Sequence, residues 1–129
     1  MPVARNHMSR DLLTVDSTLA LAEVAARMVE REVGAVLVLE GERLAGILTE
    51  RDVLRAVARG IRDDAVVADW MTTDPETIEP EESTTHAATL MMHGGFRHLP
   101  VTKDGKVVGI LSIRDLMRIA LEDSAPRGV

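Results

Sequence analysis

The stretch Gly46-Ile47-Leu48-Thr49-Glu50-Arg51-Asp52 recurs 63 residues later as Gly109-Ile110-Leu111-Ser112-Ile113-Arg114-Asp115. In each copy a glycine precedes an apolar pair and a hydroxyl residue, and an aspartate three positions further on opens a run of apolar residues at helical spacing. This pattern predicts a buried strand that leads directly into the N-terminus of a helix. The rest of the sequence is organised around this duplicated motif, residues 46–52 and 109–115.

The hydroxyl and the carboxylate of the motif have two interpretations. Thr49 and Asp52, like Ser112 and Asp115, have the spacing of a capping box, in which both side chains bind free N–H groups at a helix start. The alternative is a polyol or phosphate site, because a helix N-terminus attracts anions and an ionised aspartate accepts two hydrogen bonds from a ribose diol. The glycine before it would let such a ligand approach the backbone closely. Duplication in one register favours a binding site over capping alone.

Composition limits the size and the chemistry of the core. The chain has 129 residues, of which 46% are hydrophobic, and this predicts one sizeable core rather than two independent ones. Trp70 and Phe96 are the only residues of the Phe, Trp and Tyr class, so the core must be aliphatic. The sequence contains no cysteine, which excludes disulfides, thiolate metal sites and a cysteine nucleophile.

The charge distribution argues against nucleic acid as a partner. The formal net charge is -6, and the segment 63–96 holds eight acidic residues and no lysine or arginine. No broad basic surface is therefore available for phosphates. The N-terminus lacks the apolar stretch of a signal peptide, and no apolar run approaches the ~20 residues of a membrane span. We therefore expect a cytoplasmic protein without nucleic acid or membrane partners.

The duplication extends over nearly the whole chain. An offset of 63 aligns residues 3–62 with 66–125 without a gap. A repeat of this size usually needs a neighbour to bury its apolar face. The sequence therefore predicts a first repeat over 1–62, a linker over 63–75, a second repeat over 76–123, and a tail over 124–129 that is expected to fray.

Hydrophobic periodicity and turn residues predict the same elements in both repeats. Asp16, Ser17 and Thr18 are favourable N-cap residues for the first helix, and Asp104-Gly105 is the strongest hairpin signal of the chain. The first repeat is predicted to contain an extended segment 12–15, helix 19–31 ended by Gly34, strands 35–39 and 44–48, and helix 50–59 with Gly60 as its C-cap. The second is predicted to contain an extended segment 76–79, helix 82–93 ended by Gly94-Gly95, strands 98–102 and 106–111, and helix 113–122.

This element order, the duplicated motif and the segment Phe96-Arg97-His98-Leu99-Pro100-Val101 resemble a tandem pair of CBS domains, also called a Bateman module. The resemblance covers essentially the whole chain. It implies an α/β (α+β) fold of two β-α-β-β-α repeats that pack with pseudo-twofold symmetry and leave two clefts. It also implies a regulatory module that senses an adenosyl ligand, namely AMP, ADP, ATP, NAD or S-adenosylmethionine, with AMP or ATP favoured and no catalytic cofactor.

The resemblance further assigns roles to single residues. Asp52 and Asp115 would hold ribose hydroxyls, and their hydroxyl partners in the motif would contact phosphate or ribose. Residues about Thr14 and Thr77 would line the adenine pocket. The candidate ligand-binding residues are therefore Thr14, Gly34, Ala35, Gly46, Thr49, Arg51, Asp52, Thr77, Arg97, His98, Pro100, Gly109, Ser112 and Asp115.

Arg97 and His98 suit a phosphate group, because arginine forms a bidentate fork and histidine donates a hydrogen bond. A basic pair at this place is also typical of a solvated strand entry. In the family each cleft usually combines the motif of one repeat with strands of the other, which implies that this pair faces the ligand held by Asp52. The corresponding positions of the first repeat, Gly34 and Ala35, offer only backbone groups, so we expect the two clefts to bind unequally.

Other polar residues indicate no further chemistry. Arg51, Arg55 and Arg59 form a basic stripe that is typical of a solvated helix face, from which Arg51 would reach phosphate if the stripe borders a cleft. His86 and His93 have no clearly placed third ligand, so no metal site is predicted. The sequence contains no Ser-His-Asp order and no Gly-rich phosphate loop, and we expect no enzymatic activity. The alternative function is a dimeric interaction scaffold whose clefts are empty.

The predicted helices 82–93 and 113–121 indicate a homodimer. Their apolar faces are wider than the stripe needed to cover one sheet. The surplus would be an exposed patch unless a second copy of the chain covers it. The apolar residues are Ala87, Ala88, Leu90, Met91 and Met92 in the first helix, and Ile113, Leu116, Met117, Ile119, Ala120 and Leu121 in the second.

Overall fold

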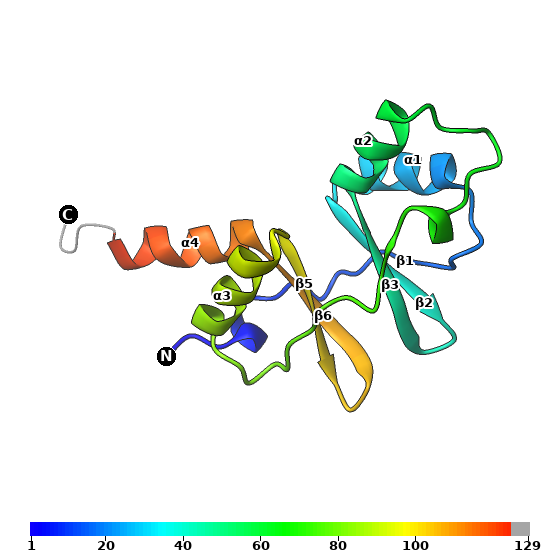
Figure 1. The fold of residues 1–129 in the computed structure, drawn as a ribbon. Coiled ribbons are helices and arrows are strands. Elements are labelled where there is room, and N and C mark those ends of the chain that lie inside the picture. Colours follow the sequence, from blue (N-terminus) through cyan, green and yellow to red (C-terminus); the bar gives the residue numbers. More distant parts are fainter. Residues whose placement is uncertain (125–129) are drawn as a thin grey trace. The chain divides into compact units, whose positions relative to one another are not determined.

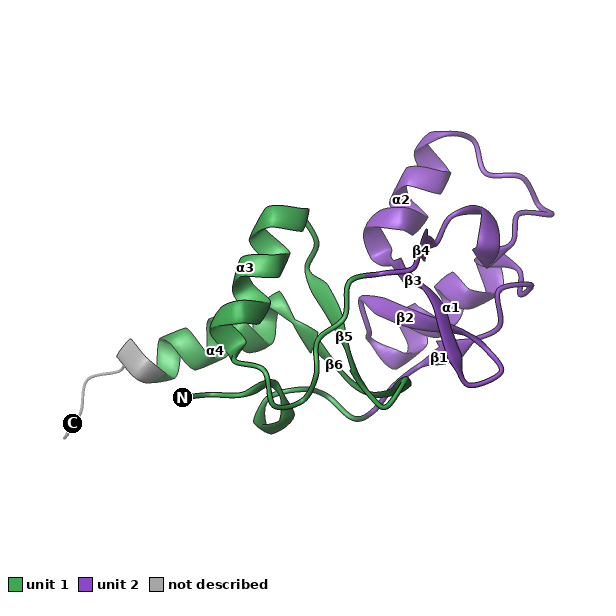
Figure 2. Cartoon of the chain, turned by 60° about the horizontal axis from the view of Figure 1, so that its bottom comes forward, with its two compact units in different colours: residues 1–10, 76–129 green, residues 11–75 purple. Residues whose placement is uncertain are grey.

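The chain forms two compact units, which Figure 2 shows in separate colours. Unit 2 comprises residues 11–75, and unit 1 comprises residues 1–10 together with the chain from residue 76 onward. The computed structural model describes residues 1–124, with side chains for 1–122. Apart from Ser124, the predicted tail therefore lies outside the described residues. None of the helices in this described part has the length and apolar character that a membrane span requires.

Unit 2 contains a four-stranded sheet and two α-helices (Figure 1). Its elements are β1 (Thr14–Val15), α1 (Leu21–Arg31), β2 (Ala35–Glu40), β3 (Arg43–Thr49), α2 (Glu50–Ala58), the 3-10 helix η2 (Val67–Asp69) and β4 (Thr72–Thr73). The strand order is β1-β2-β3-β4, with β1 parallel to β2 and the other neighbours antiparallel.

Unit 1 repeats this arrangement around a two-stranded hairpin (Figure 1). Its elements are the 3-10 helix η1 (Ala4–Asn6), α3 (Thr84–Gly94), β5 (His98–Lys103), β6 (Lys106–Ser112) and α4 (Ile113–Ser124). Ile78 forms a parallel bridge to Val101, and Ser9 an antiparallel bridge to Ile110, in the places that β1 and β4 take in unit 2. The predicted order of strand, helix, strand, strand and helix is therefore confirmed, with the first strand of the second repeat reduced to the bridge at Ile78.

Each unit has its own cluster of buried side chains, so the prediction of a single core is wrong. In unit 2 the cluster joins one face of β2 and β3, through Val36, Val38 and Leu48, to α1 and α2. In unit 1 Leu99, Val101 and Leu111 play the same part against α3. Each fully buried Leu or Val side chain contributes about 1.5–3 kcal/mol relative to exposure. Small aliphatic repeats can sustain two cores because each receives an additional segment of chain.

The additional segments cross over between the repeats. Ala4, from the start of the chain, is fully buried in the cluster of unit 1, whereas Val67, its equivalent in the duplication, is fully buried in the cluster of unit 2. Backbone hydrogen bonds fix both segments, for example from Ala4 N–H to Glu82 O at 2.9 Å and from Val67 N–H to Leu19 O at 3.0 Å. The predicted linker 63–75 thus contains η2 and β4 and completes unit 2.

The first helix ends at residue 31 as predicted, but it begins at a position that the sequence did not predict. It starts at Leu21 instead of residue 19, because Leu19 and the next residue pair with the segment around Val67. Asp16 does not cap it. The N–H and hydroxyl of Thr18 donate to the Asp16 carboxylate at 2.9 and 2.8 Å, and these bonds lower the pKa of that carboxyl.

The helix ends at the predicted residue, Arg31, but it is stopped by Glu32, which takes the left-handed conformation (φ 55) at the C-cap, and not by Gly34. The equivalent residue of the second repeat is Gly95 (φ 71), which adopts this conformation without steric penalty. The stop predicted at Gly94-Gly95 is therefore confirmed. Gly60, also at positive φ (76), follows the C-cap residue Arg59 instead of being the cap itself.

Candidate functional site

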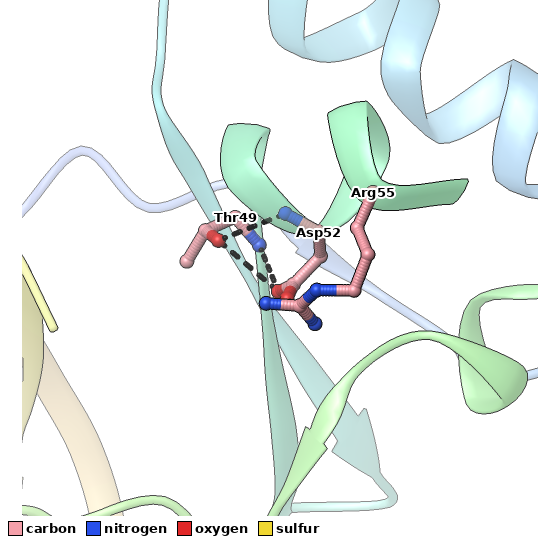
Figure 3. A network of polar contacts seen from close by, with 3 residues as sticks. All are labelled: Thr49, Asp52 and Arg55. Carbon is pink, nitrogen blue, oxygen red and sulfur yellow. Dashed lines mark hydrogen bonds and ion pairs between the residues drawn. The ribbon is translucent and has the colours of Figure 1, made fainter. Parts of the chain in front are cut away.

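The first copy of the motif joins β3 to α2 through a hydrogen-bonded cap (Figure 3). The Asp52 Oδ2 atom accepts hydrogen bonds from the N–H of Thr49 at 2.9 Å and from its hydroxyl at 3.1 Å, while the Asp52 N–H donates to Thr49 Oγ1 at 3.4 Å. These are the reciprocal bonds of a capping box. Asp52 is only 4% exposed, and a buried carboxylate requires such partners. The capping interpretation of the motif is thus realised, and any ligand must share this carboxylate.

Arg55 completes this network from the next turn of α2 (Figure 3). Its Nη1 donates to Asp52 Oδ1 at 3.1 Å, and its side chain is 45% exposed, compared with 6% for the side chain of Asp52. The sequence predicted Arg55 as part of a solvated stripe, and this contact was not predicted. The signal was present in the Asp-x-x-Arg spacing, since residues three apart on a helix are neighbours.

The second copy of the motif forms the same network at the start of α4. Asp115 Oδ2 accepts from the N–H of Ser112 at 2.8 Å and from its hydroxyl at 3.0 Å, and the Asp115 N–H donates to Ser112 Oγ at 3.2 Å. Arg118 lies 3.4 Å from Asp115 Oδ1 and is 61% exposed, while the Asp115 side chain is 16% exposed. The second carboxylate is therefore more accessible than the first, and its ion pair with arginine is longer and more exposed.

The glycine that opens each copy is required by a close approach of the chain. A Cβ atom on Gly46 would lie 2.7 Å from both Met71 Sδ and Thr72 O, and one on Gly109 would lie 2.5 Å from Met8 Sδ. The two methionines belong to the crossed segments. The prediction that these glycines admit a ligand did not include this contact with the methionines.

In each unit the residue before the second strand accepts a hydrogen bond from the first residue of the helix that starts in the motif. The Glu50 N–H donates to Gly34 O at 3.0 Å, and the Ile113 N–H donates to Arg97 O at 2.8 Å. The first residues of these strands pair with the hydroxyl residues of the motif, Ala35 with Thr49 and His98 with Ser112. Unit 1 thus gathers its basic pair and the second motif around one helix N-terminus.

The two threonines assigned to adenine lie on the first extended segment of each unit. Thr14 pairs with Leu37 of β2. Thr77 precedes Ile78, whose N–H donates to Pro100 O at 3.1 Å. Each threonine therefore lies beside the second strand of its own unit, as the duplication predicts.

The candidate residues thus divide into two sets, one in each unit. Thr14, Gly34, Ala35, Gly46, Thr49, Arg51 and Asp52 belong to unit 2, and Thr77, Arg97, His98, Pro100, Gly109, Ser112 and Asp115 belong to unit 1. That Arg97 and His98 meet a ligand held by Asp52 stays a prediction, because these residues belong to different units. Within residues 1–122, His, Asp and Glu side chains form no group of three that could hold a metal ion. His86 instead lies 3.4 Å from Glu82.

Comparison with known proteins gives a consistent result for sequence and fold. A family model described as CBS domain matches residues 4–59 and 67–122. A 17.7 kDa protein of Acidianus ambivalens is 40% identical over 111 residues, which are 84% of this chain and 66% of that protein. The chain spans 66%, 58% and 44% of the length of three curated relatives, so it corresponds to only part of each.

Two solved structures share the fold. A CBS domain protein of Pyrobaculum aerophilum complexed with AMP has a TM-score of 0.84 and 30% identity, and the match covers 93% of this chain and 96% of that one. The CBS domain pair of protein MJ0100, in complex with 5'-methylthioadenosine and S-adenosyl-L-methionine, has a TM-score of 0.89 and covers 96% of this chain and 99% of that one. Its 22% identity supports the fold alone.

Proposed function

Because this chain belongs to the CBS domain family and carries a tandem pair of these domains, we propose that it is a regulatory module that binds an adenosyl ligand. The observation that carries the proposal is the network of Thr49 and the buried Asp52 at the start of α2, repeated in the second motif. A carboxylate suits the hydroxyls of a ribose, and a helix N-terminus suits a phosphate. We propose a sensing role without catalysis.

AMP is the ligand that we propose first, since a relative of 30% identity is described in complex with AMP. In this proposal Asp52 holds the ribose hydroxyls, and Arg97 and His98 bind the phosphate. Thr14 and Thr77 mark the adenine pockets. We expect the second site, around Asp115, to bind more weakly, because the first repeat has Gly34 and Ala35 where the second has the basic pair.

AMP is expected to raise the melting temperature of the protein, and GMP is expected to raise it less. A ligand that binds the folded state at 100 times its Kd adds about 2.7 kcal/mol to the free energy of unfolding. Backbone groups of an aliphatic pocket can match the adenine edge, whereas the exocyclic groups of guanine would be desolvated without partners. A thermal-shift series with AMP, ADP, ATP, NAD, S-adenosylmethionine and GMP measures this difference.

The same series separates the proposal from the scaffold alternative. Equal shifts with AMP and GMP would remove the claim of base selectivity. No shift with any of the ligands would contradict ligand sensing and favour a scaffold, because a bound ligand must stabilise the state it binds.

We also propose that the protein is a homodimer that pairs through its helices. Large apolar side chains are exposed at equivalent positions of the two repeats, namely Val29 (79%) and Met92 (78%), and Leu54 (69%) and Met117 (59%). Leu121 is 70% exposed on the same helix as Met117. An apolar surface that is duplicated with the fold suits pairing with another copy of itself.

Light scattering is expected to give about twice the monomer mass of 14.1 kDa for the wild type and the monomer mass for a Leu54→Glu, Met117→Glu variant. Both side chains are exposed, so the charges should disturb pairing without disturbing a core. Lys103→Glu, at the tip of the second hairpin, is the matched control and should stay dimeric. A wild type of 14.1 kDa at tens of micromolar would contradict the dimer.

A further inference from the structure

The carboxylate of Asp52 has little hydrogen-bonding capacity left for a ligand. An ionised carboxylate offers about four acceptor positions, two on each oxygen. Oδ2 already accepts two hydrogen bonds from Thr49, at 2.9 and 3.1 Å, and Oδ1 accepts one from Arg55 at 3.1 Å. A ribose cis-diol that donates both hydroxyls therefore needs one more position than this arrangement leaves open.

The three existing partners differ in how easily they can leave. The N–H of Thr49 is fixed by the backbone at the junction of β3 and α2, and the Thr49 hydroxyl also accepts from the Asp52 N–H as part of the cap. Arg55 is attached by a long side chain that is 45% exposed. Its guanidinium can be hydrated after it leaves, so Arg55 is the partner that is displaced with the smallest free-energy change.

We propose that Arg55 is an exchangeable counter-ion of Asp52, which the cis-diol of a bound nucleotide displaces from Oδ1. This inference rests on the proposed function and adds a residue that limits the affinity of the site for ligands with an intact diol. A 2'-deoxy ligand donates one hydroxyl to the carboxylate and can use the open position beside Arg55. Arg118 has the same place in the second motif, with a longer contact of 3.4 Å and more exposure.

The test is isothermal calorimetry of the full chain with AMP and 2'-deoxy-AMP. In the Arg55→Met variant AMP no longer has to displace a counter-ion, and its Kd is expected to fall about two- to fivefold, the equivalent of a partly exposed ion pair. The Kd of 2'-deoxy-AMP should change less than twofold. Arg59→Met is the matched control, because it removes a charge from the same helix at a residue outside the Asp52 network and should leave both constants unchanged.

A measurement on the wild type does not depend on the variant folding. The side-chain Nε resonance of Arg55 in a ¹⁵N-labelled protein is expected to shift when AMP binds and to stay in place when 2'-deoxy-AMP binds. An Arg55→Met variant that binds AMP more weakly or equally, or that binds both ligands more tightly to the same degree, overturns the inference. If wild type binds neither ligand, the proposed function fails first, which distinguishes the two failures.

Discussion

Replacing Asp52 with alanine is expected to weaken AMP binding about 10- to 150-fold, because a charged hydrogen-bond acceptor contributes roughly 1.5–3 kcal/mol. The same change removes one half of the capping box at the start of α2 and should lower the free energy of unfolding by about 0.5–2 kcal/mol. Calorimetry at a temperature well below the melting transition measures the first effect, and urea unfolding measures the second.

Two variants separate binding from folding in this experiment. Asp52→Asn keeps a side-chain oxygen that can accept the Thr49 N–H, so the cap should persist while the charge at the ligand is lost. Asp115→Ala removes the equivalent cap in the other unit and should affect the tight AMP site less. A tight site that survives Asp52→Ala and disappears with Asp115→Ala would show that the ligand is held by the second motif.

Arg97→Ala extends the same titrations to the phosphate. It should weaken AMP while sparing adenosine, because the guanidinium meets only the phosphate. Unit 1 places the Arg97 backbone at the start of α4, next to the second motif. If Arg97→Ala and Asp115→Ala both abolished the tight site and Asp52→Ala did not, the ligand would be bound within one repeat and the cross-repeat assignment would be wrong.

A charged side chain at residue 4 is expected to destabilise unit 1. Ala4 is fully buried in the core of unit 1, in one cluster with Ile78, Leu99 and Leu111. Ala4→Glu forces an unpaired carboxylate into this core and should lower the free energy of unfolding of unit 1 by about 3–5 kcal/mol. Amide hydrogen exchange should accelerate in β5 and β6 before it changes in β2 and β3.

Asn6→Glu is the control for this variant, since residue 6 is exposed in the same helical turn. Val67→Glu should have the opposite regional effect and accelerate exchange in β2 and β3, because Val67 is buried in unit 2. Faster exchange in β2 and β3 of the Ala4→Glu variant would mean that residues 1–10 pack with the repeat that follows them directly in sequence.

The elements around the duplicated motif were predictable because their signals are local. A glycine, an apolar pair and a hydroxyl–aspartate pair define the ends of β3 and β6 and the starts of α2 and α4 within seven residues. The first helix was predicted less well, since its start depends on pairing with residues near Val67, far along the chain. The crossed segments were missed for the same reason, because nothing in residues 3–10 indicates which repeat they complete.

Part of the candidate site was likewise predictable from local sequence, and part was not. The capping geometry of Thr49 and Asp52 follows from their spacing, and the structure reproduces it in both copies. The contact of Arg55 with Asp52 depends on whether the guanidinium folds back along the helix or extends into solvent, and spacing alone does not decide between the two. Which groups meet the ligand stays a prediction, because the candidate residues belong to two different units.

The crossing of the leading segments has a consequence for synthesis on the ribosome. Unit 2 has all its residues once Pro75 has emerged, so it can fold while the rest of the chain is still being made. Residues 1–10 leave the ribosome before unit 2, yet their partners β5 and β6 emerge only after residue 97. Until then the side chains of Ala4 and Met8 have no core to pack against and stay accessible to chaperones. Closure of unit 1 over this long sequence separation is therefore expected to be the slow step of folding.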